Sequence, residues 1–100
     1  MDITKKEAAQ FLSNANDDKR FFCNDGHVLS NLVELGDHLQ DMNAKIFSFH
    51  VTDANNDLSN WVRDVIGDNE LAEKLLAAKT QEDAARIVSE RIKLLKKKSA

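Results

Sequence analysis

The chain has 100 residues, of which 42% are hydrophobic, a formal charge of −3, one cysteine, three glycines and no proline. This length and apolar content suit one compact domain, and the absence of proline favours an all-α fold. The single Cys23 excludes an internal disulfide and fits a reducing compartment, while no apolar run approaches the roughly 18 residues that cross a bilayer. We therefore expect a cytoplasmic protein with no membrane partner.

Residues 1–20 are predicted to form an N-terminal helix and a connector. Thr4 and Glu7 make a capping box, in which each side chain accepts a hydrogen bond from the other residue's backbone N–H. A helix over residues 5–14 is expected to follow and to bury Ala8, Phe11 and Leu12. Residues 17–20 are all charged, which indicates a polar connector.

A short extended aromatic segment, Phe21 and Phe22, is expected before the second helix. It leads to a turn at Asp25 and Gly26, because glycine accepts the positive φ that tight turns require. Asn31 can then cap a helix over residues 32–42. Its apolar side chains recur at helical spacing: Leu32, Leu35, Leu39 and Met42.

The stretch HVTDANNDLSNW, from His50 to Trp61, lies between two further predicted helices. Asn43 can cap the first of them, which extends through His50. The second carries the clearest amphipathic pattern of the chain, at spacings i, i+3, i+4 and i+7: Leu58, Trp61, Val62 and Val65. Gly67 is placed to end this helix in the left-handed conformation.

Two more helices bring the expected number to about six short helices. Asp68 can cap one that turns Leu71, Leu75 and Ala78 inward. Thr80 and Asp83 begin the last, whose inner side chains are Ala84, Val88, Ile92 and Leu95. Residues 21–95 then form the helical core, and residues 96–100 form a basic tail that we expect to be disordered.

Charge is divided unevenly along the chain. Residues 1–83 carry eight Lys and Arg against sixteen Asp and Glu, a balance of −8, whereas residues 84–100 carry six against one, a balance of +5. A nucleic-acid-binding protein usually presents a basic face on its folded body, and this body is acidic. Lysines also complement the dipole at a helix C-terminus. We therefore expect any nucleic-acid association to be weak and confined to the tail.

Three strings of residues carry a resemblance to a known family. They are Phe22-x-x-Asp25-Gly26, then Leu32-x-Glu34-Leu35-x-x-x-Leu39-x-x-Met42-x-x-x-x-Phe47-x-x-His50-Val51, and then Asn56-Asp57-Leu58-x-x-Trp61-Val62-x-Asp64-Val65-x-Gly67-Asp68-x-x-Leu71-Ala72. The pattern, over residues 21–95, resembles a small prokaryotic family, frequent in archaea, that is catalogued as a domain of unknown function. Leu58 departs from the phenylalanine expected at that position. The resemblance implies no activity, cofactor or catalytic residue.

The candidate functional residues gather around the predicted turn and in the stretch that follows the third helix. They are Asp25, His27, His50, Asp53, Asn56, Asp57 and Trp61. Because a histidine near carboxylates can titrate near neutrality, these side chains could converge for acid–base chemistry or for ligand binding.

A purely structural role, as helix caps, turn residues and core residues, accounts for more of these candidate residues than a functional site does. Asn56 or Asp57 can cap the helix that carries Trp61, which would pack in the core. Asp53 and Asn55 can close the turn, and His50 can be a hydrogen-bonded core histidine. We favour this interpretation, with a polar pair of His50 and Asp57 inside the joint left open.

Metal-binding patterns are weaker. Asp53, Asn55, Asp57 and Asp64 match positions of a calcium loop, but Leu58 stands where that loop needs glycine. The zinc-type ligands are Cys23, His27, His38 and His50. Cys23 and His27 span a turn, but the other two lack the paired close spacing of known zinc modules. No glycine-rich phosphate loop, serine elbow or HExxH motif occurs, so we expect no cofactor and no catalytic activity.

We therefore expect a noncatalytic protein-interaction or accessory module with a protein partner. The first alternative is a small-ligand or metal-binding domain that uses His50 and its acidic neighbours. The second is weak nucleic-acid association through the basic tail.

Overall fold

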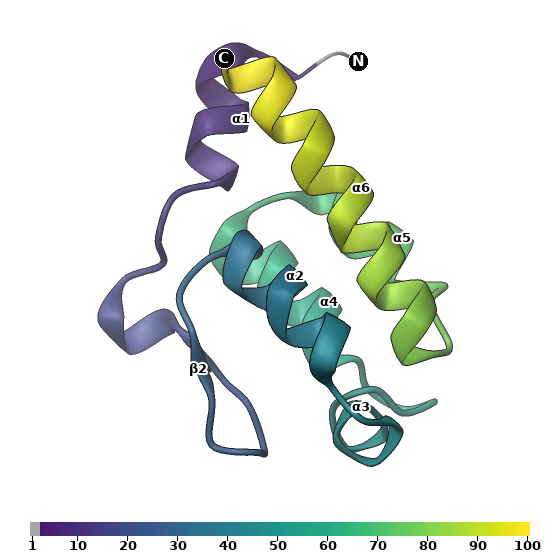
Figure 1. Cartoon of the computed structure of the whole chain (residues 1–100). Helices are drawn as coiled ribbons and strands as arrows, with labels where there is room; N and C mark the ends of the chain where they lie inside the picture. The colour runs from purple at the N-terminus through teal and green to yellow at the C-terminus, as the bar shows by residue number, and fades with distance from the viewer. Residues whose placement is uncertain (1–2) are drawn as a thin grey trace.

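Helical segments surround one core, and a short hairpin projects from one end of it (Figure 1). The computed structural model describes residues 3–100. Within these residues there are six α-helices: α1 (Lys5–Phe11), α2 (Leu32–Asp41), α3 (Ala44–His50), α4 (Asp57–Trp61), α5 (Asn69–Leu76) and α6 (Gln81–Ser99). The helical prediction is confirmed, and each α-helix begins at a residue whose side chain accepts a backbone N–H of the first turn.

A two-stranded antiparallel sheet corrects the all-α expectation. Its strands are β1 (Phe21–Phe22) and β2 (Val28–Leu29), with Phe21 opposite Leu29 and Phe22 opposite Val28. Gly26 has a φ of 95° and lies in the turn, as predicted. The extended aromatic segment was expected, but its partner strand was not, because two residues are too few to show the alternating pattern of a strand.

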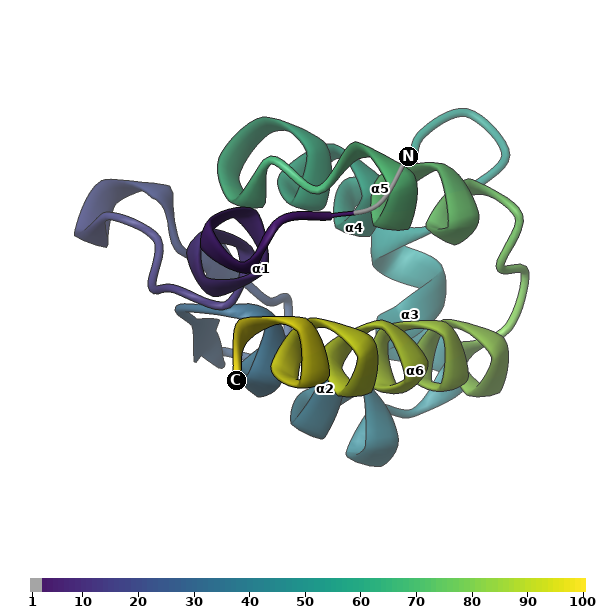
Figure 2. The same cartoon turned by 90° about the horizontal axis from the view of Figure 1, so that it is seen from above.

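The long helix α6 forms one side of the core. Both views show α1 beside its C-terminal part and α2 alongside it, and α5 also packs on it (Figures 1 and 2). Gly36 lies where α2 meets α6, and a Cβ there would lie 3.0 Å from the Ile92 Cδ1 atom, so that the Ile92 side chain would have to shift. The largest fully buried apolar side chains come from α2, α4, α5, α6 and the turn after α4: Leu32, Leu35, Leu39, Leu58, Val62, Leu71, Leu75, Val88 and Leu95.

A π-helical turn, η2 (Val62–Ile66), changes the predicted stripe after α4. The Gly67 N–H donates to the Val62 carbonyl at 2.8 Å, five residues back, and Gly67 ends the turn with a φ of 89°. The wider turn rotates the side chains that follow. As a result Ile66 is buried and Val65 only partly so, although Val65 was the expected core residue.

Both ends of the chain differ from expectation. The first helix ends at Phe11 rather than at residue 14, and the Ser13 hydroxyl donates to the Gln10 carbonyl just beyond it. The connector that follows contains a short 3₁₀ turn, η1 (Asp17–Lys19). The tail at residues 96–100 was expected to be disordered, but α6 continues to Ser99, because lysine favours helix and Leu95 anchors the last turns in the core.

The N-terminal helix belongs to the same core as the rest of the chain. Ala8 is fully buried, and α1 packs against α6. Between residues 3 and 100, no helix is long and apolar enough to cross a membrane.

Candidate functional site

His50, the last residue of α3, connects three segments of the chain. Its Nε2 atom accepts a hydrogen bond from the Asn24 backbone N–H at 2.9 Å, and its Nδ1 atom lies 3.0 Å from Asp57 Oδ2. Because a backbone N–H can only donate, Nε2 carries no proton. The ring is therefore the tautomer with its proton on Nδ1, which donates to Asp57. Neither nitrogen is left for a ligand or a substrate.

The His50 ring is also enclosed by aromatic side chains. Its centroid lies 5.1 Å from that of Phe21 in the hairpin and 5.0 Å from that of Phe49. Only 4% of His50 is exposed. The predicted core histidine is confirmed, and the polar pair with Asp57 that was left open does form.

The start of α4 has the predicted cap. Asn56 Oδ1 accepts the Ser59 N–H at 2.9 Å, and Asn56 Nδ2 donates to the Leu75 carbonyl of α5 at 3.1 Å. The Asn56 side chain thus caps the start of α4 and is hydrogen-bonded to the last turn of α5. The cap residue is Asn56, while the Asp57 carboxylate accepts a hydrogen bond from His50 instead.

The turn before α4 is closed by Thr52 and Asn55 rather than by Asp53 and Asn55. The Thr52 N–H donates to the Asn55 carbonyl at 2.8 Å, and the Asn55 N–H donates to the Thr52 hydroxyl at 3.1 Å. Asp53 is exposed and takes no part in closing the turn. Since Asn55 Nδ2 donates to Asp57 Oδ1 and α4 already begins at Asp57, the calcium-loop arrangement is absent from residues 52–64.

Trp61 is a core residue, as the amphipathic pattern predicts. Its indole N–H donates to the Lys19 carbonyl at 2.8 Å, and its ring centroid lies 5.7 Å from that of Phe21 in a T-shaped arrangement. The side chain therefore ties the connector and the hairpin to α4. It is not available as a stacking platform, because only 7% of the residue is exposed.

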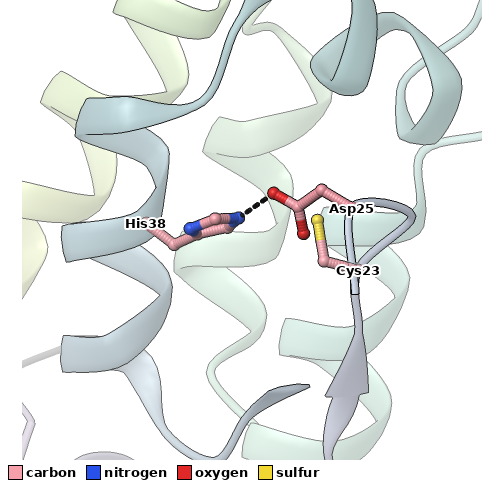
Figure 3. A group of neighbouring side chains, drawn as sticks. All are labelled: Cys23, Asp25 and His38. Atoms are coloured by element: carbon pink, nitrogen blue, oxygen red, sulfur yellow. Dashed lines mark hydrogen bonds and ion pairs between the residues drawn. The ribbon is translucent and has the colours of Figure 1, made fainter. Parts of the chain in front are cut away.

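A second polar group lies on the other side of the hairpin turn, around Asp25. Asp25 Oδ2 is 2.7 Å from His38 Nε2 of α2 (Figure 3). Asp25 Oδ1 also accepts the His27 backbone N–H at 3.0 Å. The His27 Nδ1 atom lies 3.1 Å from the same Oδ1. The rings of His27 and His38 are in contact, with centroids 4.1 Å apart and ring planes inclined by 35°.

Cys23 completes this group from the end of β1. Its sulfur, the Asp25 carboxylate and the His38 ring nitrogen lie within 4.8 Å of one another, and Cys23 is buried (Figure 3). We call Cys23, Asp25 and His38 the hairpin cluster. Asp25 and His27 were singled out in the sequence, and His38 was named with Cys23 and His27 as a zinc-type ligand. The contact between His38 and Asp25 was not predicted, because α2 reaches the turn only in the folded chain.

The electrostatics of the hairpin cluster follow from its hydrogen bonds. Partial burial acts to raise the pKa of the Asp25 carboxyl, but donors on His27, Cys23 and His38 outweigh it and hold that pKa well below its usual range. Burial raises the pKa of the Cys23 thiol, which disfavours a free thiolate at neutral pH. Cys23 is therefore not an activated nucleophile.

A buried ion pair between α5 and α6 was missed in the sequence. Arg91 Nε and Nη2 donate to the two Asp68 carboxylate oxygens, each at 2.8 Å, and Nη1 pairs with Glu70. Burial acts to lower the pKa of Arg91, but Asp68 and Glu70 outweigh it and raise that pKa. Asp68 was predicted only as a cap, and Arg91 only as part of the basic end. Nothing local signals a pair that is 23 residues apart.

Comparisons with protein-family models, with curated proteins and with solved structures find no match to this chain. The family resemblance therefore stays a prediction. The fold and the two polar groups define a small helical domain with a histidine-linked joint and a histidine–cysteine–carboxylate cluster beside its hairpin turn.

Proposed function

We propose that this domain is a noncatalytic interaction or accessory module that binds a protein partner through its hairpin end. The observation that carries the proposal is the exposure of large apolar side chains there. Phe22 in β1 is 62% exposed and Phe49 near the end of α3 is 60% exposed, while Val28, opposite Phe22 in the sheet, is 42% exposed. We call Phe22, Val28 and Phe49 the aromatic end.

Contacts within the domain position the segments that carry the aromatic end. The Asn24 N–H bond to His50 links the hairpin to α3, and His50 packs between Phe21 and Phe49. Aromatic side chains are enriched at the centres of protein interfaces, and preorganised ones lose little conformational freedom on binding. The joint around His50 therefore supports a partner surface.

Two features favour an accessory role over catalysis or ligand binding at the joint. Both His50 nitrogens are engaged, and over residues 3–100 no buried side-chain nitrogen or oxygen lacks a hydrogen-bond partner. We therefore propose no ligand site at His50. A cytoplasmic location is part of the proposal, and the free Cys23 suits a reducing compartment.

Site-specific photo-crosslinking in an extract of the native organism tests the proposal. A benzophenone-bearing aromatic residue placed at Phe22 or at Phe49 preserves the apolar character, and the same residue at exposed Glu73 of α5 is the matched control. We expect a discrete adduct with another protein from positions 22 and 49 and not from position 73. The absence of an adduct, or the same adducts from all three positions, would contradict the proposal.

A further inference from the structure

We propose that the hairpin cluster is a binding site for a divalent cation of the zinc type, with Cys23 Sγ, one Asp25 carboxylate oxygen and His38 Nε2 as its protein ligands. The proposal does not depend on the proposed function, since the aromatic end and the hairpin cluster use different side chains. The two experiments can therefore fail separately.

The geometry is close to that of a metal site. The three ligand atoms lie within 4.8 Å of one another, and Asp25 and His38 are already 2.7 Å apart. Bonds of about 2.0–2.3 Å to a tetrahedral ion place its ligand atoms about 3–4 Å apart. The sulfur must therefore move slightly inward, and the Asp25 to His38 contact must open slightly. Figure 3 shows the Asp25 carboxylate beside both the Cys23 sulfur and the His38 ring.

The ligand set is supported by two rigid elements. Cys23 follows β1, and its N–H donates to the His27 carbonyl at 2.9 Å across the turn. His38 projects from α2, whose Leu35 and Leu39 are fully buried. Ligands on packed elements keep their positions when the ion is absent, which lowers the ordering cost of binding it.

Charge and donor type both select the ion. A thiolate, a carboxylate and a neutral imidazole carry two negative charges in total, which neutralises a divalent cation. Sulfur and nitrogen donors disfavour calcium and magnesium, which prefer oxygen ligands. Three protein ligands leave one position of a tetrahedral zinc site for water.

Binding exchanges protons without any redox change. The Cys23 S–H bond breaks as the sulfur–metal bond forms, and that proton leaves to solvent. The His38 Nε2 atom must present its lone pair to the ion, so its proton moves through solvent to Nδ1. Asp25 exchanges its hydrogen bond from His38 for one bond to the metal.

Titration of the reduced full-length chain with Co²⁺, followed by competition with Zn²⁺, tests the proposal. We expect one equivalent of Co²⁺ to produce a sulfur-to-cobalt charge-transfer band, which Zn²⁺ then abolishes. Cys23→Ala should remove the band. His38→Gln should weaken binding by at least about 100-fold, since even partners outside the ligand set contribute 10–100-fold.

Asp41→Asn is the matched control, because Asp41 lies one turn beyond His38 in α2 and lines the same surface depression without belonging to the cluster. Its affinity should equal that of the wild type. Far-UV circular dichroism confirms that each variant is folded, and the two α2 variants suffice if Cys23→Ala does not fold. Wild-type protein that binds no Co²⁺ or gives no charge-transfer band would overturn the proposal, as would equal weakening by Asp41→Asn and His38→Gln.

Discussion

Single side chains in this domain often join two or three segments at once. His50 connects the hairpin, α3 and α4 through its two ring nitrogens, and Asn56 starts α4 while it holds the carbonyl of Leu75. The stretch from residue 50 to residue 61 is therefore a structural joint, and its density of polar side chains reflects the number of backbone groups that it must satisfy.

Removal of the Asn56 side chain should destabilise the fold. Asn56→Ala deletes the acceptor for the Ser59 N–H and the donor to Leu75. Loss of a cap costs about 0.5–2 kcal/mol, and each kcal/mol lowers the melting midpoint of a domain of this size by about 4–8 °C. Thermal unfolding should show this decrease. Asp53→Ala, at an exposed position in the same loop, should change the free energy of unfolding by no more than about 0.5 kcal/mol, so an equal loss in both variants would contradict the assignment.

The capping box of α1 predicts a pH effect at Glu7. The Thr4 backbone N–H donates to Glu7 Oε1 at 3.1 Å, and this hydrogen bond favours the ionised carboxylate and lowers the pKa of Glu7. Its contribution to stability is full above the ordinary glutamate pKa and is lost as pH falls through the lowered value in the folded protein. An NMR titration should therefore place the Glu7 midpoint below that of the same residue in denaturant. Equal midpoints would argue against the capping box.

Helices that begin at a recognisable capping residue could be predicted from the sequence. Elements without a local sequence pattern could not. Thr4, Asn43 and Thr80 each cap a helix through an N–H three residues ahead, so residue type and spacing suffice to identify them. Strand β2 has two residues and pairs only across a turn, which leaves no periodic pattern. The π-helical turn at Val62–Ile66 likewise has no sequence signature, because its spacing is still compatible with an ordinary helix.

The same distinction applies to the candidate site, where contacts between residues close in the sequence could be predicted and contacts between distant residues could not. The contact between His50 and Asp57 spans seven residues and was open to prediction, as was the pairing of Asp25 with His27. His38 joins Asp25 only because α2 packs beside the hairpin, and that packing is a tertiary event.

The contact between α5 and α6 depends on a buried ion pair. Arg91→Ala would leave the Asp68 carboxylate, which is 1% exposed, without its charged partner. Breaking a buried pair in this way costs about 3–5 kcal/mol. Arg86→Ala is the control on the same helix, since Arg86 pairs with exposed Glu90 and such surface pairs contribute about 0–1 kcal/mol. Chemical denaturation should separate the two variants clearly, and similar losses would contradict a structural role for the buried pair.

Across the whole molecule, the two ends carry different chemistry. The lysine-rich end of α6 lies beside α1, whereas the hairpin and α3 lie at the opposite end (Figure 1). The hairpin end carries both the aromatic end and the hairpin cluster. The hairpin supplies part of each, while α3 contributes Phe49 and α2 contributes His38. We therefore assign the proposed functions to the hairpin end.

The most direct test of the metal site at this end is an anomalous-scattering measurement at the zinc edge on crystals of the reduced protein grown with equimolar Zn²⁺. The proposed site predicts one strong peak between Cys23 Sγ, the Asp25 carboxylate and His38 Nε2, with Asp25 no longer hydrogen-bonded to His38. A map with no peak there, or with zinc only on exposed carboxylates elsewhere, would contradict it.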